Sequence, residues 1–265
     1  MKKLISIFLI LALSTPAWAW DISAALQGYW KMNDNAASTT VLDASGNGHN
    51  GTFNDASGNP NTSTHSVAGK LNTALTMDDA DDYINMGDVC DQGTNNFSVA
   101  FWYYSDEPPM GAHIIKKQDA SSYGYLIEVL NSLKVKLNMY DNTGSAQYNA
   151  QAETVLTSGI FNLVVIVCDR TQTTAKVYID NVESTVTNTF GTLSGVGNVD
   201  NAGNFNIGNA ALARRLAGDI DNVQIFNRVL TSDEITALWN SGAGTEATSG
   251  GASGTVGNSN ILILE

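Results

Sequence analysis

The chain has 265 residues and carries a net charge of −13, from 26 acidic and 13 basic side chains. A surface for nucleic acid or an anionic membrane needs clustered Lys and Arg, which are absent, so the composition argues against both partners. The length suits one large domain that buries its own hydrophobic core.

Residues 1–19 have the pattern of a secretory signal peptide. Lys2 and Lys3 precede an apolar run over residues 4–13, and residues 17–19 are Ala-Trp-Ala, with small side chains where a signal peptidase reads. We therefore expect cleavage after this segment and a secreted protein, either periplasmic or extracellular. The run is shorter than the roughly 18 residues that span a bilayer, and no later segment is long and apolar enough.

Short strands dominate the rest of the chain. Segments rich in β-branched and aromatic residues alternate with Gly, Asn, Asp and Ser, which favour turns. Strands are predicted over residues 97–104, 124–129, 133–140, 161–168, 175–179 and 222–226. Several short strands at near-regular spacing predict an all-β sandwich or barrel.

One helix is predicted near the C-terminus. Thr231 or Ser232 can cap it, acidic residues fill its first turn, and Gly242 ends it. Residues 243–265 form a Gly- and Ser-rich tail, too polar to order itself, which ends in the apolar residues 261–264. Those four residues could be the end of a truncated chain or a small packed strand. Alternatively, they form a strand donated to another chain for self-assembly.

The two cysteines leave the question of a disulfide open. Cys168 ends an apolar run and is expected in the core, whereas Cys90 lies in a polar loop. A secreted protein permits a bridge, but a domain of this size does not need one.

Four segments in order carry a resemblance to a known family. They are GYWKMND at 28–34, DASGNGHNG at 43–51, GK at 69–70 with ALTMDDADDYI at 74–84, and GDIDNVQIFNRVLTSDEI at 218–235. Together they resemble the LamG-like jelly-roll domains of the concanavalin A-like superfamily, although Met77 replaces an aromatic residue and Asp79 a glycine. The resemblance implies a two-sheet antiparallel jelly roll with one short C-terminal helix over residues 20–242. Because this fold hosts many functions, it says little about the ligand.

The last of these segments places a carboxylate in the predicted core. Alternation along a strand puts Asp221 on the same face as Val223 and Ile225. A buried carboxylate costs several kcal/mol unless it is hydrogen-bonded or binds a metal. The interior is also expected to contain Trp30, Trp102, Ile166 and either Phe101 or Val99.

A structural calcium ion is implied by the resemblance, because many jelly-roll modules hold Ca²⁺ between the first loop and the last strand. Asp43 and Asn47 offer a carboxylate and an amide oxygen in a glycine-containing loop, and Asp219 or Asp221 could complete the site. The alternative is that backbone N–H groups satisfy Asp221. The acidic residues 78–82 lack the glycine and glutamate of an EF-hand and are interpreted as a solvated turn.

The sequence does not indicate an enzyme. Retaining glycosidases need two carboxyl groups about 5–5.5 Å apart, and Glu128 has no acidic partner on its strand face. Asp219 and Asp221 alternate correctly but belong to the segment interpreted as structural. The three histidines are His49, His65 and His113; they lie far apart in the sequence, so neither a zinc site nor a Ser-His-Asp triad is indicated.

Carbohydrate binding would need exposed aromatic rings beside hydrogen-bonding side chains. Tyr123, Tyr125 and Tyr140 are the candidate rings, and Arg214 and Arg215 could bind an acidic sugar or a partner's carboxylate. These residues could equally be ordinary surface cover. We therefore expect a non-catalytic binding module for a glycan; the alternative is an adhesion or assembly protein that contacts cell-surface proteins through its sandwich and tail.

Overall fold

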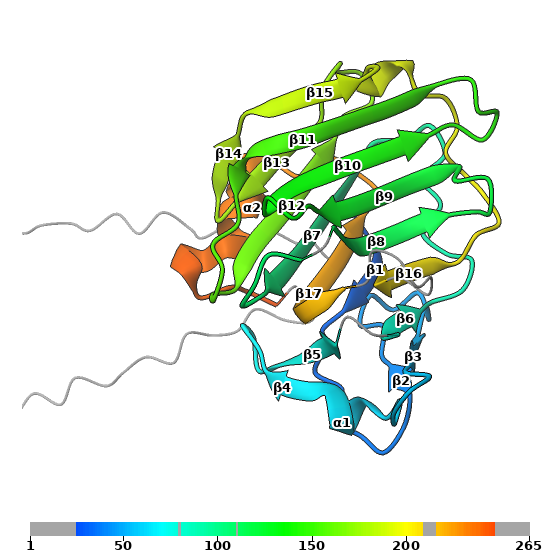
Figure 1. Cartoon of the computed structure of the whole chain (residues 1–265). Coiled ribbons are helices and arrows are strands. Elements are labelled where there is room, and N and C mark those ends of the chain that lie inside the picture. Colours follow the sequence, from blue (N-terminus) through cyan, green and yellow to red (C-terminus); the bar gives the residue numbers. More distant parts are fainter. Residues whose placement is uncertain (1–24, 79–80, 110, 209–215, 247–265) are drawn as a thin grey trace, which may run out of the picture.

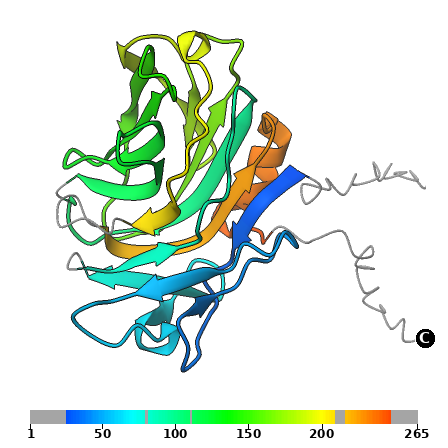
Figure 2. The ribbon, with the colours of Figure 1, turned by 90° about the vertical axis from the view of Figure 1, so that its right-hand side faces the viewer.

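Two antiparallel β-sheets packed face to face make up the protein (Figures 1 and 2). The computed structural model describes residues 25–78, 81–109, 111–208 and 216–246. Every strand pairing within these ranges is antiparallel. The jelly roll predicted from the sequence is confirmed, and so is its C-terminal helix.

The first sheet has eight strands within the described residues. The strand β17 lies between β7 and β5, and β1 also pairs with it. The order is β14 (Val182–Ser184), β13 (Lys176–Ile179), β12 (Asn162–Cys168), β7 (Phe97–Tyr104), β17 (Ala217–Phe226), β5 (Thr73–Asp78) and β4 (Ser66–Ala68), with β1 (Leu26–Trp30) beside β17.

The second sheet has nine strands in the same part of the chain. Its middle strands, β8 to β10, follow one another in the sequence and form successive hairpins. The order is β15 (Val186–Phe190), β11 (Gln147–Val155), β10 (Lys134–Tyr140), β9 (Gly124–Val129), β8 (Ala112–Gln118), β16 (Phe205–Gly208), β6 (Tyr83–Asn85), β3 (Gly51–Asn54) and β2 (Thr40–Val41). A four-residue helix, α1 (Thr62–His65), was not expected.

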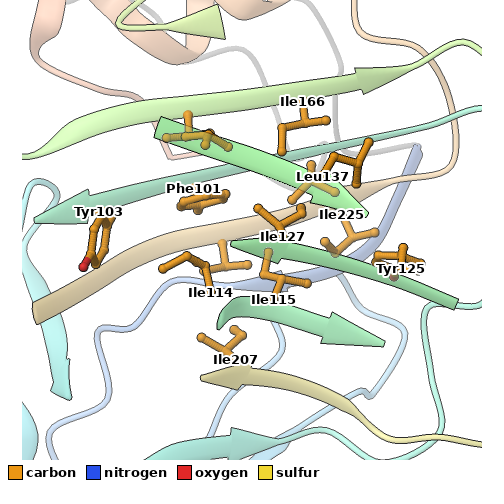
Figure 3. Close-up of a cluster of buried hydrophobic side chains, with 14 of the residues drawn as sticks. Phe101, Tyr103, Ile114, Ile115, Tyr125, Ile127, Leu137, Ile166, Ile207 and Ile225 are labelled. Atoms are coloured by element: carbon orange, nitrogen blue, oxygen red, sulfur yellow. The ribbon is translucent and has the colours of Figure 1, made fainter. Parts of the chain in front are cut away.

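Side chains from both sheets fill the space between them (Figure 3). Phe101 and Ile225 of the first sheet lie against Ile127 and Leu137 of the second. The expected interior residues Trp30, Val99, Phe101, Ile166, Val223 and Ile225 are all fully buried in this core. Val99 and Phe101 both point inward because they are two residues apart on β7.

A second apolar layer covers the outer face of the first sheet. Trp102 belongs to it, which corrects the expectation that this side chain lies between the sheets. Its neighbour Phe101 points inward, so strand alternation turns Trp102 outward. There the indole stacks on Trp239 of helix α2 (Ser232–Trp239), with ring centroids 5.6 Å apart.

A bulge in β17 overturns the predicted placement of Asp221. The register between β17 and β7 shifts between Asp221 and Gln224, and Asn222 has a positive φ of 53°. The inserted residue reverses the alternation, so Asp221 pairs with Trp102 on the outer face while Val223 and Ile225 remain in the core. Asp221 is nevertheless fully buried, beneath the loop that contains Leu71.

The chain after Gly242, assigned to the tail from its composition, remains packed through residue 246. The Glu246 carboxylate accepts hydrogen bonds from Lys31, Asn33 and Asn72, which no composition rule reveals. The predicted signal peptide and residues 261–264 lie outside the described residues. None of the described helices is long and apolar enough to cross a membrane.

Both cysteines are buried as free thiols. Cys168 is part of the inter-sheet core, as expected, and Cys90 joins it there. Burial raises the pKa of each thiol to about 12, so neither is a reactive thiolate near neutral pH.

The helix cap gives a first test of the fold. Thr231 Oγ1 accepts a hydrogen bond from Glu234 N, and a Glu234 carboxylate oxygen accepts one from Thr231 N at 2.8 Å. Thr231→Ala should lower the free energy of unfolding by about 1 kcal/mol, because it removes one half of this capping box. Urea unfolding of Thr231→Ala beside Ser232→Ala, an exposed first-turn control, would measure this; equal losses in the two variants would contradict it.

Candidate functional site

The outer face of the nine-stranded sheet is polar over its middle strands. Alternation along β9 and β10 sends Ile127 and Leu137 into the core and turns Glu128 and Asn138 outward. On the neighbouring strand β11, Gln151 also faces outward, opposite Lys136. This face is therefore lined by hydrogen-bonding groups supported by a rigid sheet.

At one end of this face, the strands β10, β11 and β15 form a hollow of about 530 Å³. Tyr140 and Phe190 contribute aromatic rings to its lining, and Gln147 contributes an amide. Tyr140 and Gln147 are opposite each other in the β10–β11 ladder, and Phe190 pairs with Asn149 on β11. Phe190 is 55% exposed, so its ring is accessible at the surface of the hollow.

The turn between β10 and β11 forms the rim of the hollow. The Asp141 carboxylate accepts hydrogen bonds from Thr143 Oγ1 at 2.9 Å and from Ser145 N at 2.8 Å. Despite some desolvation, these bonds hold the pKa of the Asp141 carboxyl below its usual value. Gly144 has a φ of 70°, and Tyr123 packs directly against it. The rim is thus fixed by a hydrogen-bonded turn.

A carboxylate lies near the middle of the same face. Glu128 is 3% exposed, and its Oε1 accepts a hydrogen bond from Asn138 Nδ2. Lys136 Nζ and His113 Nε2 each lie 3.8 Å from a Glu128 carboxylate oxygen. Its neighbours include an amide, an amine and an imidazole, whereas a retaining glycosidase would need a second carboxyl group here.

The predicted ligand-binding residues divide into three groups. Tyr140 lines the hollow and Tyr123 supports its rim. The predicted binding role of Tyr125 is wrong, because alternation on β9 points its side chain into the core. There its hydroxyl donates to the Cys90 carbonyl at 2.8 Å. Arg214 and Arg215 lie outside the described residues.

Sequence reasoning missed Phe190. It ends a strand, Val186–Phe190, whose other residues include two threonines and an asparagine, and it precedes a glycine. An isolated aromatic side chain in a polar strand is the only signal that could have identified it.

Asp43 and Asn47, the first-loop residues expected to bind calcium, instead form hydrogen bonds that hold the loop in place. Asp43 Oδ1 accepts from Tyr29 N and Ser45 N, and Asp43 Oδ2 accepts from His49 N at 2.9 Å. Although burial opposes it, these bonds hold the pKa of the Asp43 carboxyl below its usual value. Asn47 turns its amide nitrogen inward to donate to the Leu26 carbonyl at 2.8 Å.

The expected partners on the last strand are directed elsewhere. Asp219 lines a separate hollow with Tyr104 and Asp106, and Asp221 Oδ2 accepts from Leu71 N at 2.8 Å. Asp43, Asn47, Asp219 and Asp221 therefore bond to different segments and do not form one ligand sphere. The predicted calcium set does not fit this arrangement, because the Asp43 oxygens already accept N–H groups and the bulge turns Asp221 outward.

A family comparison matches most of this chain. The profile described as the concanavalin A-like lectin/glucanases superfamily matches residues 78–236, which include β6 to β17 and most of α2. No curated protein sequence matches the chain.

Solved structures with the same fold include two kinds of protein. Domain 4 of AbnA, a GH43 extracellular arabinanase from Geobacillus stearothermophilus in complex with arabinotriose, has 19% identity and a TM-score of 0.58, covering 80% of this chain and 97% of that one. The binding domain of Paraclostridial Mosquitocidal Protein 1 has 14% identity and a TM-score of 0.62, covering 83% and 53%.

The receptor binding domain of botulinum neurotoxin D has 15% identity and a TM-score of 0.59, covering 83% of this chain and 54% of that one. This chain thus spans about half the length of the two toxin domains and nearly all of the arabinanase domain. At these identities the likeness shows the fold alone.

Asp221 allows a test by pH. Burial raises the pKa of its carboxyl to about 7, despite the hydrogen bond from Leu71 N, whereas an unfolded Asp titrates near 3.9. The folded state therefore holds this proton more tightly, and its stability is expected to fall as pH rises from about 4 through 7. Asp221→Asn should remove this loss, on the order of a few kcal/mol, and so stabilise the protein more at pH 8 than at pH 5.

Urea unfolding of wild type and Asp221→Asn at both pH values measures the effect. Glu183→Gln, which changes an exposed carboxylate on the edge strand β14, is the control. If Asp221→Asn destabilises equally at pH 5 and pH 8, the carboxylate is stabilised in its ionised form and the argument fails.

Proposed function

Because the chain belongs to the concanavalin A-like lectin/glucanases superfamily, we propose that it is a non-catalytic binding module whose ligand is carbohydrate. The observation that carries the proposal is the hollow between Tyr140 and Phe190 on the outer face of the nine-stranded sheet. Its predicted location is outside the cytoplasm, after removal of the signal peptide.

The chemistry of the hollow suits a sugar. A sugar ring has an apolar face of C–H groups that packs on an aromatic ring, and hydroxyl groups around its edge that need hydrogen bonds. Tyr140 and Phe190 supply the rings, and Gln147, Ser145 and Thr192 supply donors and acceptors. The walls lie on strand ends and a hydrogen-bonded turn, so little conformational entropy is lost on binding.

The neighbours with the same fold support a binding function. One is bound to arabinotriose, and the toxin domains are described as binding or receptor-binding domains. A glycan, or a cell-surface protein that carries one, is therefore the proposed partner. Binding by the toxin domains concerns chains about twice as long, so the proposal depends on the hollow of this chain.

Removal of either aromatic ring should weaken sugar binding. Tyr140→Ala and Phe190→Ala should each raise the dissociation constant about 10-fold or more, because each loses the apolar contact with a sugar face. Tyr104→Ala, on the first sheet, is the matched control and should leave affinity unchanged. A glycan array followed by calorimetry with the best ligand provides the measurement.

The sugar-binding proposal would be abandoned if no glycan bound, or if all three variants bound equally well. Retained binding to a cell-surface protein without glycan would instead favour the adhesion alternative.

No hydrolysis of the bound glycan is expected. The side chains that contact Glu128 include Asn138, Lys136 and His113, whereas retaining cleavage requires a second carboxyl group beside the first. Incubation with a polysaccharide panel should release no reducing sugar, from wild type or from Glu128→Gln. Release by wild type that Glu128→Gln abolishes would show that the protein is an enzyme.

A further inference from the structure

A group of ionisable side chains lies at the opposite end of the nine-stranded sheet from the hollow. Asp55 follows β3, His65 ends α1, and Asp82 immediately precedes β6 (Figure 1). One carboxylate oxygen from each aspartate and one imidazole nitrogen lie within 4.8 Å of one another. All three side chains are nearly buried, at 8%, 11% and 0% exposure.

The contacts of His65 determine which of its nitrogens carries hydrogen. The ring packs on Phe53, with centroids 4.2 Å apart, and Nε2 lies 3.1 Å from the Asn59 carbonyl oxygen and 3.4 Å from Asp55 Oδ2. A carbonyl only accepts hydrogen bonds, so Nε2 is the donor. In a neutral ring the lone pair is then on Nδ1, which faces Asp82 Oδ2 at 3.6 Å, too far for a hydrogen bond.

Asp82 has an oxygen without a partner. Its Oδ2 accepts a hydrogen bond from Asp78 N at 3.1 Å, whereas its Oδ1 is buried and has no hydrogen-bond partner among the described residues. A buried carboxylate oxygen left in this state is costly unless a cation or a donor reaches it.

The acidic side chains around His65 carry more negative charge than one proton can neutralise. Asp78, Asp81 and Asp82 also bring carboxylate oxygens within 4.8 Å of one another, and Asp55 adds a fourth acid. Among the described ion pairs of these four acids, the cationic partner is His65. A protonated imidazole would supply a single positive charge, whereas a divalent ion supplies two.

We propose that Asp55, His65 and Asp82 bind a divalent transition metal such as Zn²⁺. One imidazole nitrogen and two carboxylate oxygens form a set that Zn²⁺ accepts, whereas Ca²⁺ prefers oxygen ligands alone. The Nε2 bond to the Asn59 carbonyl is the outer contact that commonly orients a metal-binding histidine. The ion ties the segment after β3, the end of α1 and the start of β6 together, so its role is structural and independent of sugar binding.

Titration of the full chain tests the site. ZnCl₂ added to chelator-treated protein at pH 7 should bind with a stoichiometry of one and raise the melting temperature. His65→Gln and Asp82→Asn should each weaken binding at least about 100-fold, since each removes a direct ligand. Co²⁺ in place of Zn²⁺ should give visible absorption bands that His65→Gln removes.

Two variants serve as matched controls. His49→Gln removes an imidazole that lies away from the proposed site, where it contacts the Gln27 carbonyl. Asp81→Asn removes an acid outside the proposed ligand set. Both should keep the wild-type affinity for Zn²⁺. If His65→Gln is not folded by circular dichroism, the wild-type Co²⁺ spectrum and Asp55→Asn decide the question.

Three results would overturn the proposal. The first is no Zn²⁺ binding by wild type, which would leave a protonated His65 between two carboxylates. The second is binding that His65→Gln does not change. The third is tighter Ca²⁺ binding that Asp81→Asn abolishes, which would place the ion on the carboxylates of 78–82 alone.

Discussion

The bulge at Asn222 in β17 is the constraint on which the layered structure depends. This strand pairs with β1, β5 and β7, so its side chains contribute to both apolar layers. The extra residue lets Val223 and Ile225 enter the inter-sheet core, while Phe226 and Asp221 face the layer beneath α2. Asn222 itself accepts a hydrogen bond from the Tyr29 hydroxyl at 2.7 Å, so its side chain connects β17 to β1 at the bulge.

The two sheets have different outer surfaces, and this difference determines where the hollow proposed to bind carbohydrate lies. Helix α2 and the segment through residue 246 cover the first sheet, where Trp239 stacks on Trp102. Around the hollow, which is lined by Tyr140 and Phe190, no other described segment covers the outer face of the second sheet. The proposed sugar site and the proposed metal site near β3 and β6 lie at opposite ends of one sheet, so a substitution at either site can be tested for its own effect.

Buried charged side chains are stabilised in this protein by ion pairs and hydrogen bonds with loop residues. Lys117 is fully buried, yet its Nζ forms ion pairs with Asp88 and Asp91 and donates to the carbonyls of Asn201 and Gly203. It thereby connects two loops that are far apart in the sequence. In the first loop, the Asp43 carboxylate is likewise stabilised by the backbone N–H groups that donate to it. Asp82 differs from both, because one of its oxygens has no such partner in the part of the chain that the structure describes.

The sequence by itself determined the fold class, the six strands with strong β-branched or aromatic patterns, and the capped helix, because these depend on local periodicity and capping chemistry. It did not reveal polar strands such as Val186–Phe190, whose register is set by pairing with β11. Tertiary structure alone moved Asp221 to the outer face and brought His65 between Asp55 and Asp82. Each of these outcomes depends on a bulge, a strand direction or a contact between distant segments, and local sequence encodes none of them.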